Sequence, residues 1–187
     1  MSEIYALIPA RGGSKRLPRK NIYPVMGKPM IMYSIEAAQG SRFLKKDNIY
    51  VSTEDAEIKE VVKPYVKVMD RPMELALDHV WTQDVVNHFA EQVKADKDDL
   101  IVIIQANSPQ LTSEIIDQCI DMLLTNKLWQ VHTVDENLIN NGAVQVLYNF
   151  VGQHQGKVNY NGVVITNLVD VHTLEDVHTV ERQMKGN

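Results

Sequence analysis

The sequence predicts an α/β domain built around a mainly parallel sheet, and two observations support this. Short apolar runs of strand length alternate with longer amphipathic stretches of helical spacing. With 187 residues and 44% hydrophobic content, the chain is long enough to bury a sizeable core. We therefore expect a single domain covering residues 1–187.

The strands and helices of the parallel part follow from this alternation. The apolar runs expected to form buried strands are Ile4–Ile8, Ile49–Ser52, Val66–Met69 and Leu100–Gln105. The stretches expected to form helices are Met30–Ala38, Glu54–Val62, Val80–Val93 and Ile115–Leu124. Pro29 suits the first turn of the first helix, and Ser52 and Asp55 have capping-box spacing before the second. In such sheets ligands bind beyond the carboxyl ends of the strands.

After Trp129 the pattern becomes richer in strands, which predicts a short β-rich C-terminal extension. The strands expected there are Gln130–Val134, Gly142–Tyr148 and Lys157–Thr166. Asn-Gly and Gln-Gly pairs between them favour turns. A last helix is expected from Thr173 to about Met184, because Thr173 and Asp176 have capping-box spacing.

Composition excludes several classes of protein. A formal net charge of −5 disfavours a general nucleic-acid binder. The one cysteine, Cys119, permits no intramolecular disulfide and lies on an apolar helical face, so we expect it to be buried. No apolar run has the length of a membrane span, and the start of the chain does not resemble a signal peptide. We therefore expect a cytoplasmic protein with no membrane partner.

A basic loop directly follows the first expected strand. Gly12 and Gly13 let the backbone turn sharply and approach an anion without a Cβ in the way. The cationic side chains of the loop are Arg11, Lys15, Arg16, Arg19 and Lys20. The spacing matches neither the P-loop nor the dinucleotide Gly-x-Gly-x-x-Gly pattern. The loop predicts a site for a small polyphosphate, with a solvated basic turn as the alternative.

The loop resembles a known signature. Residues Ile8–Ile22, which read IPARGGSKRLPRKNI, are similar to the first motif of the acylneuraminate cytidylyltransferases, the CMP-sialic acid synthetases. Further segments resemble later elements of that family in the same order: Val51–Asp55, Asp70–Asp78, Gln105–Pro109 and Asn141–Ala143. The resemblance implies a Rossmann-like nucleotidyltransferase fold. It also implies transfer of CMP from CTP to the anomeric hydroxyl of a sialic-acid-like nonulosonic or related sugar acid, with release of pyrophosphate.

The resemblance also implies roles for individual residues. The nucleotide-binding set is Ala10, Arg11, Gly12, Gly13, Ser14, Lys15, Lys20, Asn21 and Arg71, and the catalytic set is Arg11, Lys20 and Gln105. Cationic side chains and a metal ion around the phosphates would supply most of the catalysis. The alternative for Arg71 is a structural ion pair with Asp70 or Glu74, and for Gln105 a side chain that caps the backbone.

The metal site departs from the family pattern. The family has Asp-x-Asp-Thr near its C-terminus, where two carboxylates bind magnesium, and this chain has Asp170 followed by His172. By resemblance Asp170 and His172 are the metal ligands. Because magnesium prefers oxygen ligands, the imidazole should weaken Mg²⁺ binding or shift preference toward Mn²⁺. The alternative is that both residues only mark the entry to the last helix.

The acceptor side departs as well. Only Asp135–Asn140 separate the expected strand Gln130–Val134 from the motif Asn141–Ala143. By resemblance, the family carries a protruding subdomain there, which forms its dimer and reaches the partner's sugar-acid pocket. Gln110 and Leu111 stand where the family often has Leu-Arg. A homodimer would therefore not use the usual subdomain.

These departures leave three hypotheses open. The first is a cytidylyltransferase that uses CTP and a sugar acid. The second is a relative that binds a nucleotide but catalyses little or no transfer. The third is a nucleotidyltransferase for a different, smaller acceptor. Fold resemblance alone does not choose among them.

Overall fold

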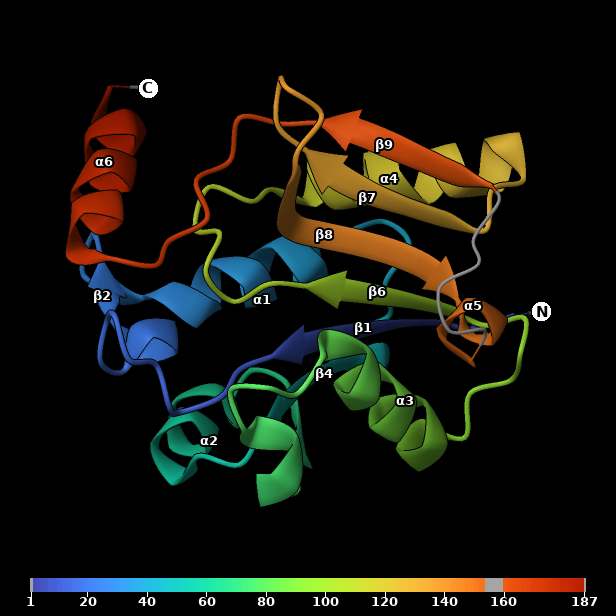
Figure 1. Ribbon diagram of the computed structural model, residues 1–187, viewed down its shortest axis with the longest axis horizontal. Helices are drawn as coiled ribbons and strands as arrows, with labels where there is room; N and C mark the ends of the chain where they lie inside the picture. Colours follow the sequence, from blue (N-terminus) through green and yellow to red (C-terminus); the bar gives the residue numbers. More distant parts are fainter. Residues whose placement is uncertain (1, 154–159, 187) are drawn as a thin grey trace.

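The computed structural model describes residues 2–153 and 160–186. Their main sheet has seven strands in the order β5-β4-β1-β6-β8-β7-β9 (Figure 1). The parallel strands of its first part are β1 (Ile4–Pro9), β4 (Ile49–Thr53), β5 (Lys67–Asp70) and β6 (Leu100–Ile104). The predicted α/β fold with a mainly parallel sheet is confirmed.

The β-rich extension continues the same sheet. It consists of β7 (Gln130–Val134), β8 (Asn140–Tyr148) and β9 (Asn161–Ile165). β8 runs antiparallel to both β6 and β7, whereas β9 is parallel to β7. The expected strand Lys157–Thr166 begins instead at Asn161 and ends at Ile165, and residues 157–159 lie outside the described part of the chain.

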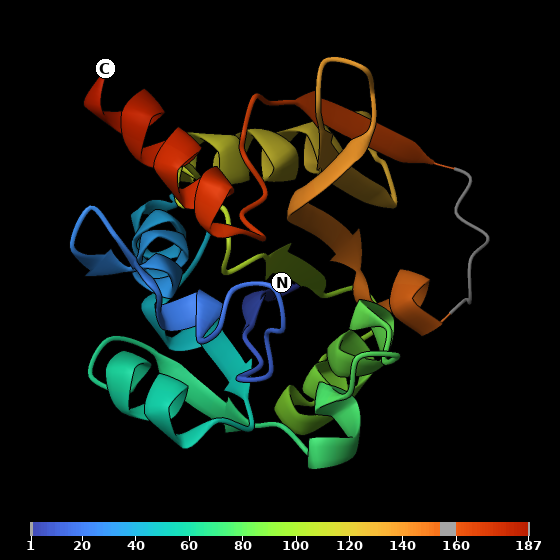
Figure 2. The same cartoon turned by 60° about the vertical axis from the view of Figure 1, so that its left-hand side comes forward.

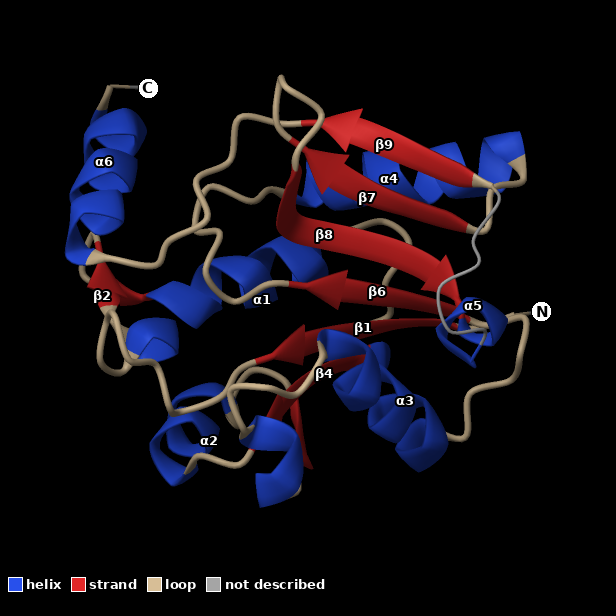
Figure 3. Ribbon diagram, in the orientation of Figure 1, coloured by secondary structure: helices blue, strands red, loops and turns tan. Residues whose placement is uncertain are grey.

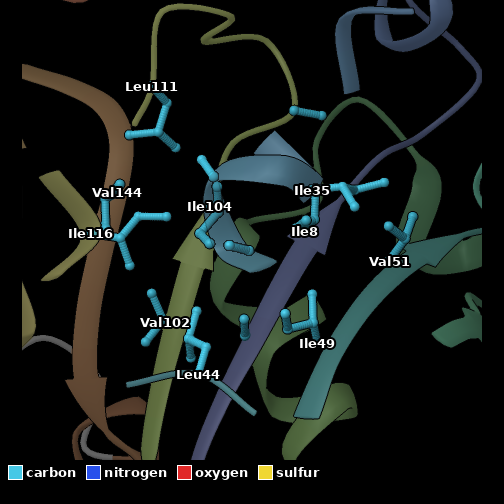
Figure 4. Close-up of a cluster of buried hydrophobic side chains, with 14 of the residues drawn as sticks. Ile8, Ile35, Leu44, Ile49, Val51, Val102, Ile104, Leu111, Ile116 and Val144 are labelled. Carbon is cyan, nitrogen blue, oxygen red and sulfur yellow. The ribbon is translucent and has the colours of Figure 1, made fainter. Parts of the chain in front are cut away.

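Helices cover both faces of the sheet (Figure 3). One face packs against α1 (Met30–Gly40), α2 (Ala56–Val62) and α4 (Ser113–Asn126), and the other against α3 (Thr82–Val93) and α5 (Asn149–Gln153). Because side chains alternate along a strand, Val102 and Ile104 of β6 join the first core, which Figure 4 shows, and Ile101 joins the second. Cys119 of α4 is buried in the first core, as expected, and burial raises its pKa to about 12.

Helix α2 begins later than the sequence predicts. β4 continues to Thr53, so Ser52 is an extended, buried strand residue that cannot cap a helix. Asp55 caps α2 instead, accepting a hydrogen bond from the Ile58 N–H at 2.9 Å. The predicted start at Glu54 with Ser52 as the cap is therefore wrong. α3 likewise begins at Thr82 rather than Val80, and α4 at Ser113 rather than Ile115.

The C-terminal helix lies against the basic loop. α6 (Leu174–Lys185) has the predicted capping box, in which Thr173 and Asp176 each bond the other's backbone. Val177 and Val180 of α6 pack with Leu17 and Val25, which belong to the segment that follows β1. Figure 2 shows the ribbon of α6 beside this segment. The end of the chain thus supports the loop after the first strand.

We also considered whether any helix could span a membrane. Within residues 2–153 and 160–186, no helix combines the length and the apolar character needed to cross a bilayer.

Candidate functional site

A cleft of about 260 Å³ lies at the carboxyl ends of β1 and β6. The predicted site residues that line it are Arg11, Ser14, Lys20, Asn21, Arg71 and Gln105. They come from the loop after β1, the segment after β5 and the end of β6, which face the viewer together in Figure 2. The sheet thus brings together residues that are far apart in sequence, as expected for ligand sites of parallel sheets.

Arg11 and Lys15 share one carboxylate. The Arg11 Nη1 lies 2.6 Å from one oxygen of Asp78, and the Lys15 ammonium contacts the other oxygen. Arg11 and Asp78 line the cleft, whereas the Lys15 side chain is 81% exposed beside it. Hydrogen bonds from Lys15 and then Arg11 lower the pKa of Asp78. Both cations predicted to hold phosphate therefore already have an anionic partner.

A glycine is required at position 12 because the Asp55 side chain lies close to its Cα. A Cβ at Gly12 would lie only 2.8 Å from the Asp55 Cγ, a distance that side chains do not tolerate. The Gly12 N–H donates to Glu54 Oε1 at 2.7 Å. Gly13 has open space around its Cα, so it makes no such demand on residue type. Ala10 is fully buried behind the loop, and its N–H donates to the Ser52 carbonyl at 2.9 Å.

Arg19 anchors the loop to α2. Its guanidinium donates to both oxygens of Asp55, at 2.6 and 2.7 Å, and also pairs with Glu57 at 2.5 Å. The hydrogen bonds from Arg19, together with the Ile58 backbone N–H, lower the pKa of Asp55 to about 2. Arg19 is therefore a structural residue of the loop, because its charge is already matched twice.

Arg71 is buried at the edge of the cleft. Only 7% of the residue is exposed, and its guanidinium donates to the Ser52 carbonyl at 2.7 Å and the Ser52 hydroxyl at 3.2 Å. Burial lowers its pKa to about 10. The alternative of an ion pair with Asp70 or Glu74 is wrong, because among the described residues the Arg71 guanidinium bonds only Ser52. Asp70 pairs instead with Lys59 at 2.6 Å.

Lys20 and Asn21 lie on a short 3-10 turn (Lys20–Ile22) inside the loop. The Asn21 amide donates to the Arg11 carbonyl at 2.9 Å, so Asn21 fixes the backbone that carries Arg11. Burial lowers the pKa of Lys20, against the opposing attraction of Asp170. The Lys20 ammonium approaches the Nδ1 atom of His172 at 3.5 Å. Lys20 is thus a cation in the cleft whose ammonium group is poorly hydrated.

Asp170 and His172 form a hydrogen-bonded pair. The His172 Nε2 lies 2.7 Å from one Asp170 oxygen, and the Asn107 amide donates to the other oxygen. In the part of the chain that the structure describes, no group of three or more His, Cys, Asp or Glu side chains could hold a metal ion together. Mg²⁺ is commonly bound through one or two carboxylates together with substrate phosphates, so Asp170 fits such an ion. His172 does not, because one ring nitrogen faces Asp170 and the other faces Lys20.

Gln105 joins two cavities. Its N–H donates to the Ala143 carbonyl at 3.0 Å and its carbonyl accepts from the Ser34 hydroxyl at 2.8 Å. Among the described residues its side-chain amide has no hydrogen-bond partner, so Gln105 does not cap the backbone. A second cavity of about 370 Å³ shares Gln105 and Thr82 with the first and is also lined by Asp170.

Several lining residues were not predicted as site residues. They are Pro9, Leu75, Leu77, Asp78, Val80, Thr82, Val85 and Asn107. Asp78 and Asn107 fall inside the segments Asp70–Asp78 and Gln105–Pro109 that resemble the family, so their position was a usable signal. The apolar residues could not be told from core residues by sequence pattern.

The fold and the site together define an α/β protein with a cationic cleft beside the loop that follows its first strand. The family model described as cytidylyltransferase matches residues 5–160. The chain belongs to this cytidylyltransferase family.

Curated relatives agree with this family. The chain is 35% identical over 160 residues to a 3-deoxy-manno-octulosonate cytidylyltransferase of Hahella chejuensis, covering 81% of this chain and 60% of that protein. It is 36% identical over 125 residues to a pseudaminic acid cytidylyltransferase of Campylobacter jejuni, covering 65% of this chain and 53% of the relative. The chain thus spans less than two thirds of the length of either relative.

Solved structures share the fold. A CMP:2-keto-3-deoxy-manno-octonic acid synthetase complexed with CTP matches with a TM-score of 0.81 at 17% identity, over 99% of both chains. A cytidylyltransferase from Leptospira borgpetersenii matches with a TM-score of 0.76 at 18% identity, over 100% of this chain and 88% of the other. At these identities the likeness is one of fold.

Proposed function

We propose that this protein transfers the cytidylyl group of CTP to a hydroxyl of a sugar acid and releases pyrophosphate. The observation that carries the proposal is the convergence of Arg11, Lys20 and Arg71 on one cleft at the carboxyl ends of β1 and β6. Triphosphate repels a nucleophile, and the leaving pyrophosphate gains negative charge. Fixed cations in a partly dry cleft oppose both effects.

Each cation suits a different part of this task. Arg11 and Lys15 lie at the open side of the cleft, where they would bind the β- and γ-phosphates. Lys20 is further buried, and burial makes its charge more effective toward the α-phosphate and the leaving oxygen. Arg71 is rigidly held by Ser52 and would orient the nucleotide without needing to reorganise.

Asp170 would hold a Mg²⁺ or Mn²⁺ ion that arrives with the triphosphate. Such an ion neutralises phosphate charge when bound. We propose Asp170 as the one protein ligand, with water and phosphate oxygens completing the coordination. His172 would instead orient Asp170 through the 2.7 Å hydrogen bond.

The second cavity would bind the acceptor. It adjoins the nucleotide cleft through Gln105 and Thr82, and its other polar lining includes Asn140, Asn141 and Gln145. Amide groups donate and accept hydrogen bonds, so they suit the hydroxyls of a sugar. We propose a nonulosonic acid of the sialic or pseudaminic type, or an eight-carbon sugar acid, as the acceptor. Two similar proteins are named for pseudaminic acid and for 3-deoxy-manno-octulosonate, which supports the pseudaminic and the eight-carbon acceptors.

One observation favours a second candidate, a relative that binds the nucleotide with little or no transfer. Asp170 is paired with His172 where two carboxylates would bind a metal ion more strongly. His172→Asp tests this candidate, because it restores a carboxylate. If the variant gains turnover over a nearly inactive parent, metal binding limits the natural chain.

The test of the proposed function is pyrophosphate release by the purified protein with each of the four common ribonucleoside triphosphates. Mg²⁺ and Mn²⁺ are compared, and sialic, pseudaminic, legionaminic and ketodeoxyoctonic acids are offered as acceptors. We expect release that needs CTP, metal and an acceptor together. Binding of CTP without release across the panel would favour the second candidate. No release with the four sugar acids, but release with a smaller hydroxyl compound, would favour a different acceptor.

A further inference from the structure

We infer that Asp78 is a built-in phosphate mimic that occupies the polyphosphate site until the ligand displaces it, and thereby sets how tightly that site binds. This inference rests on the proposed nucleotide site. Asp78 bridges Arg11 at 2.6 Å and Lys15 through its two oxygens. A carboxylate that presents two oxygens to two cations reproduces the contacts that two phosphate oxygens would make.

The segment that carries Asp78 lies over the cleft. It links the 3-10 turn Met73–Ala76 to α3, and its residues Leu77 and Val80 line the cleft. The Arg11 guanidinium also contacts the Ala76 carbonyl at 3.4 Å. Trp81, at the end of the segment, is 78% exposed and so anchors it little. The described contacts therefore attach this segment to the basic loop mainly through Asp78.

A carboxylate also binds the backbone of the basic loop. The Gly12 N–H, which could point to a phosphate oxygen, donates to Glu54 at 2.7 Å. The other oxygen of Glu54 is buried without a hydrogen-bond partner among the described residues. Asp78 thus binds Arg11 and Lys15 of the basic loop, and Glu54 binds the Gly12 N–H of the same loop. An incoming polyphosphate has to replace the Asp78 contacts, and Asp78 competes with pyrophosphate for the same cations after transfer.

The competition has a direct consequence for affinity. Two exposed ion pairs that must break before the ligand binds correspond to roughly two- to thirtyfold in affinity. Asp78→Asn removes the charge and keeps the size, which frees Arg11 and Lys15 for the ligand. Asp78→Glu keeps the charge and should retain the competition.

The experiment is calorimetric titration of the full chain with inorganic pyrophosphate in buffer without divalent metal. Asp121→Asn is the matched control, because Asp121 of α4 forms an ion pair with Arg42, and its side chain is 47% exposed, against 45% for Asp78. We expect Asp78→Asn to bind pyrophosphate about tenfold more tightly than the wild type. Asp78→Glu and Asp121→Asn should match the wild type.

Equal or weaker binding by Asp78→Asn, or no binding by either protein, overturns the inference. A parallel titration with CTP separates this failure from failure of the proposed function. If the wild type binds CTP and Asp78→Asn shows no gain for pyrophosphate, only the role of Asp78 is lost. If pyrophosphate binds more tightly to the variant but CTP does not bind, the mimic stands and the cytidylyl transfer fails.

Discussion

Lys20 shows how one residue can be kept for chemistry at a cost to stability. Burial lowers its pKa, so the folded protein holds the charged ammonium less favourably than water does. We expect Lys20→Ala to lower the rate of pyrophosphate release about 10²- to 10³-fold, as for loss of one charge-stabilising donor. The free energy of unfolding should stay equal or rise, because an unfavourably buried charge is removed.

The measurement for Lys20 pairs initial rates with urea denaturation. Lys46→Ala is the control, since Lys46 is an exposed lysine and its loss changes the net charge equally. An active Lys20→Ala enzyme would remove Lys20 from the catalytic set. A strongly destabilised one would make it a structural residue.

Asp55 gives a prediction for acid stability. Its pKa is about 2, below the ordinary 3.8, chiefly because Arg19 and the Ile58 N–H bond the ionised form. A carboxyl group whose pKa is lower in the folded than in the unfolded state stabilises the fold at pH values above its unfolded-state pKa. This stabilisation is lost as the pH falls toward 2. Allowing for partial solvent screening, we expect a loss of about 1 kcal/mol between pH 5 and pH 2. Urea midpoints across this range measure it, and Arg19→Gln should flatten the curve.

At the scale of elements, α6 connects the end of the chain to the site. Val177 and Val180 pack against Leu17, which lies in the basic loop ahead of Lys20. Loosening the start of α6 should therefore also loosen the loop. We expect Thr173→Ala to lower the free energy of unfolding by about 1 kcal/mol through loss of the N-cap, and to weaken CTP binding.

The control for this helix lies within it. Thr179 is half-buried, and its hydroxyl donates to the Glu175 carbonyl of the preceding turn and accepts from Arg182. Thr179→Ala should change stability by less than about 0.5 kcal/mol and leave CTP affinity alone. If Thr173→Ala destabilises the protein without affecting CTP binding, α6 supports only the fold.

At the scale of the whole molecule, the sheet was predictable because burial on both faces leaves apolar runs without polar alternation. The starts of the helices were less predictable from the sequence. Ser52 and Asp55 are both good N-cap residues, and only the length of β4 decides between them. The basic loop was visible in sequence. The partnership of Arg11 with Asp78 was not, because 67 positions separate them and only the folded sheet brings them together.

Nucleotide selectivity is also a property of the whole molecule, since a ligand that binds only the folded state raises the stability of every element. At 100 times its dissociation constant, CTP should add about 2.7 kcal/mol to the free energy of unfolding. For a chain of 187 residues this corresponds to a rise of about 5–10 °C in melting temperature. Thermal scans with CTP, UTP, ATP and GTP at one concentration measure the effect. We expect the largest shift with CTP; equal shifts with all four would mean that the cleft binds the triphosphate and does not select the base.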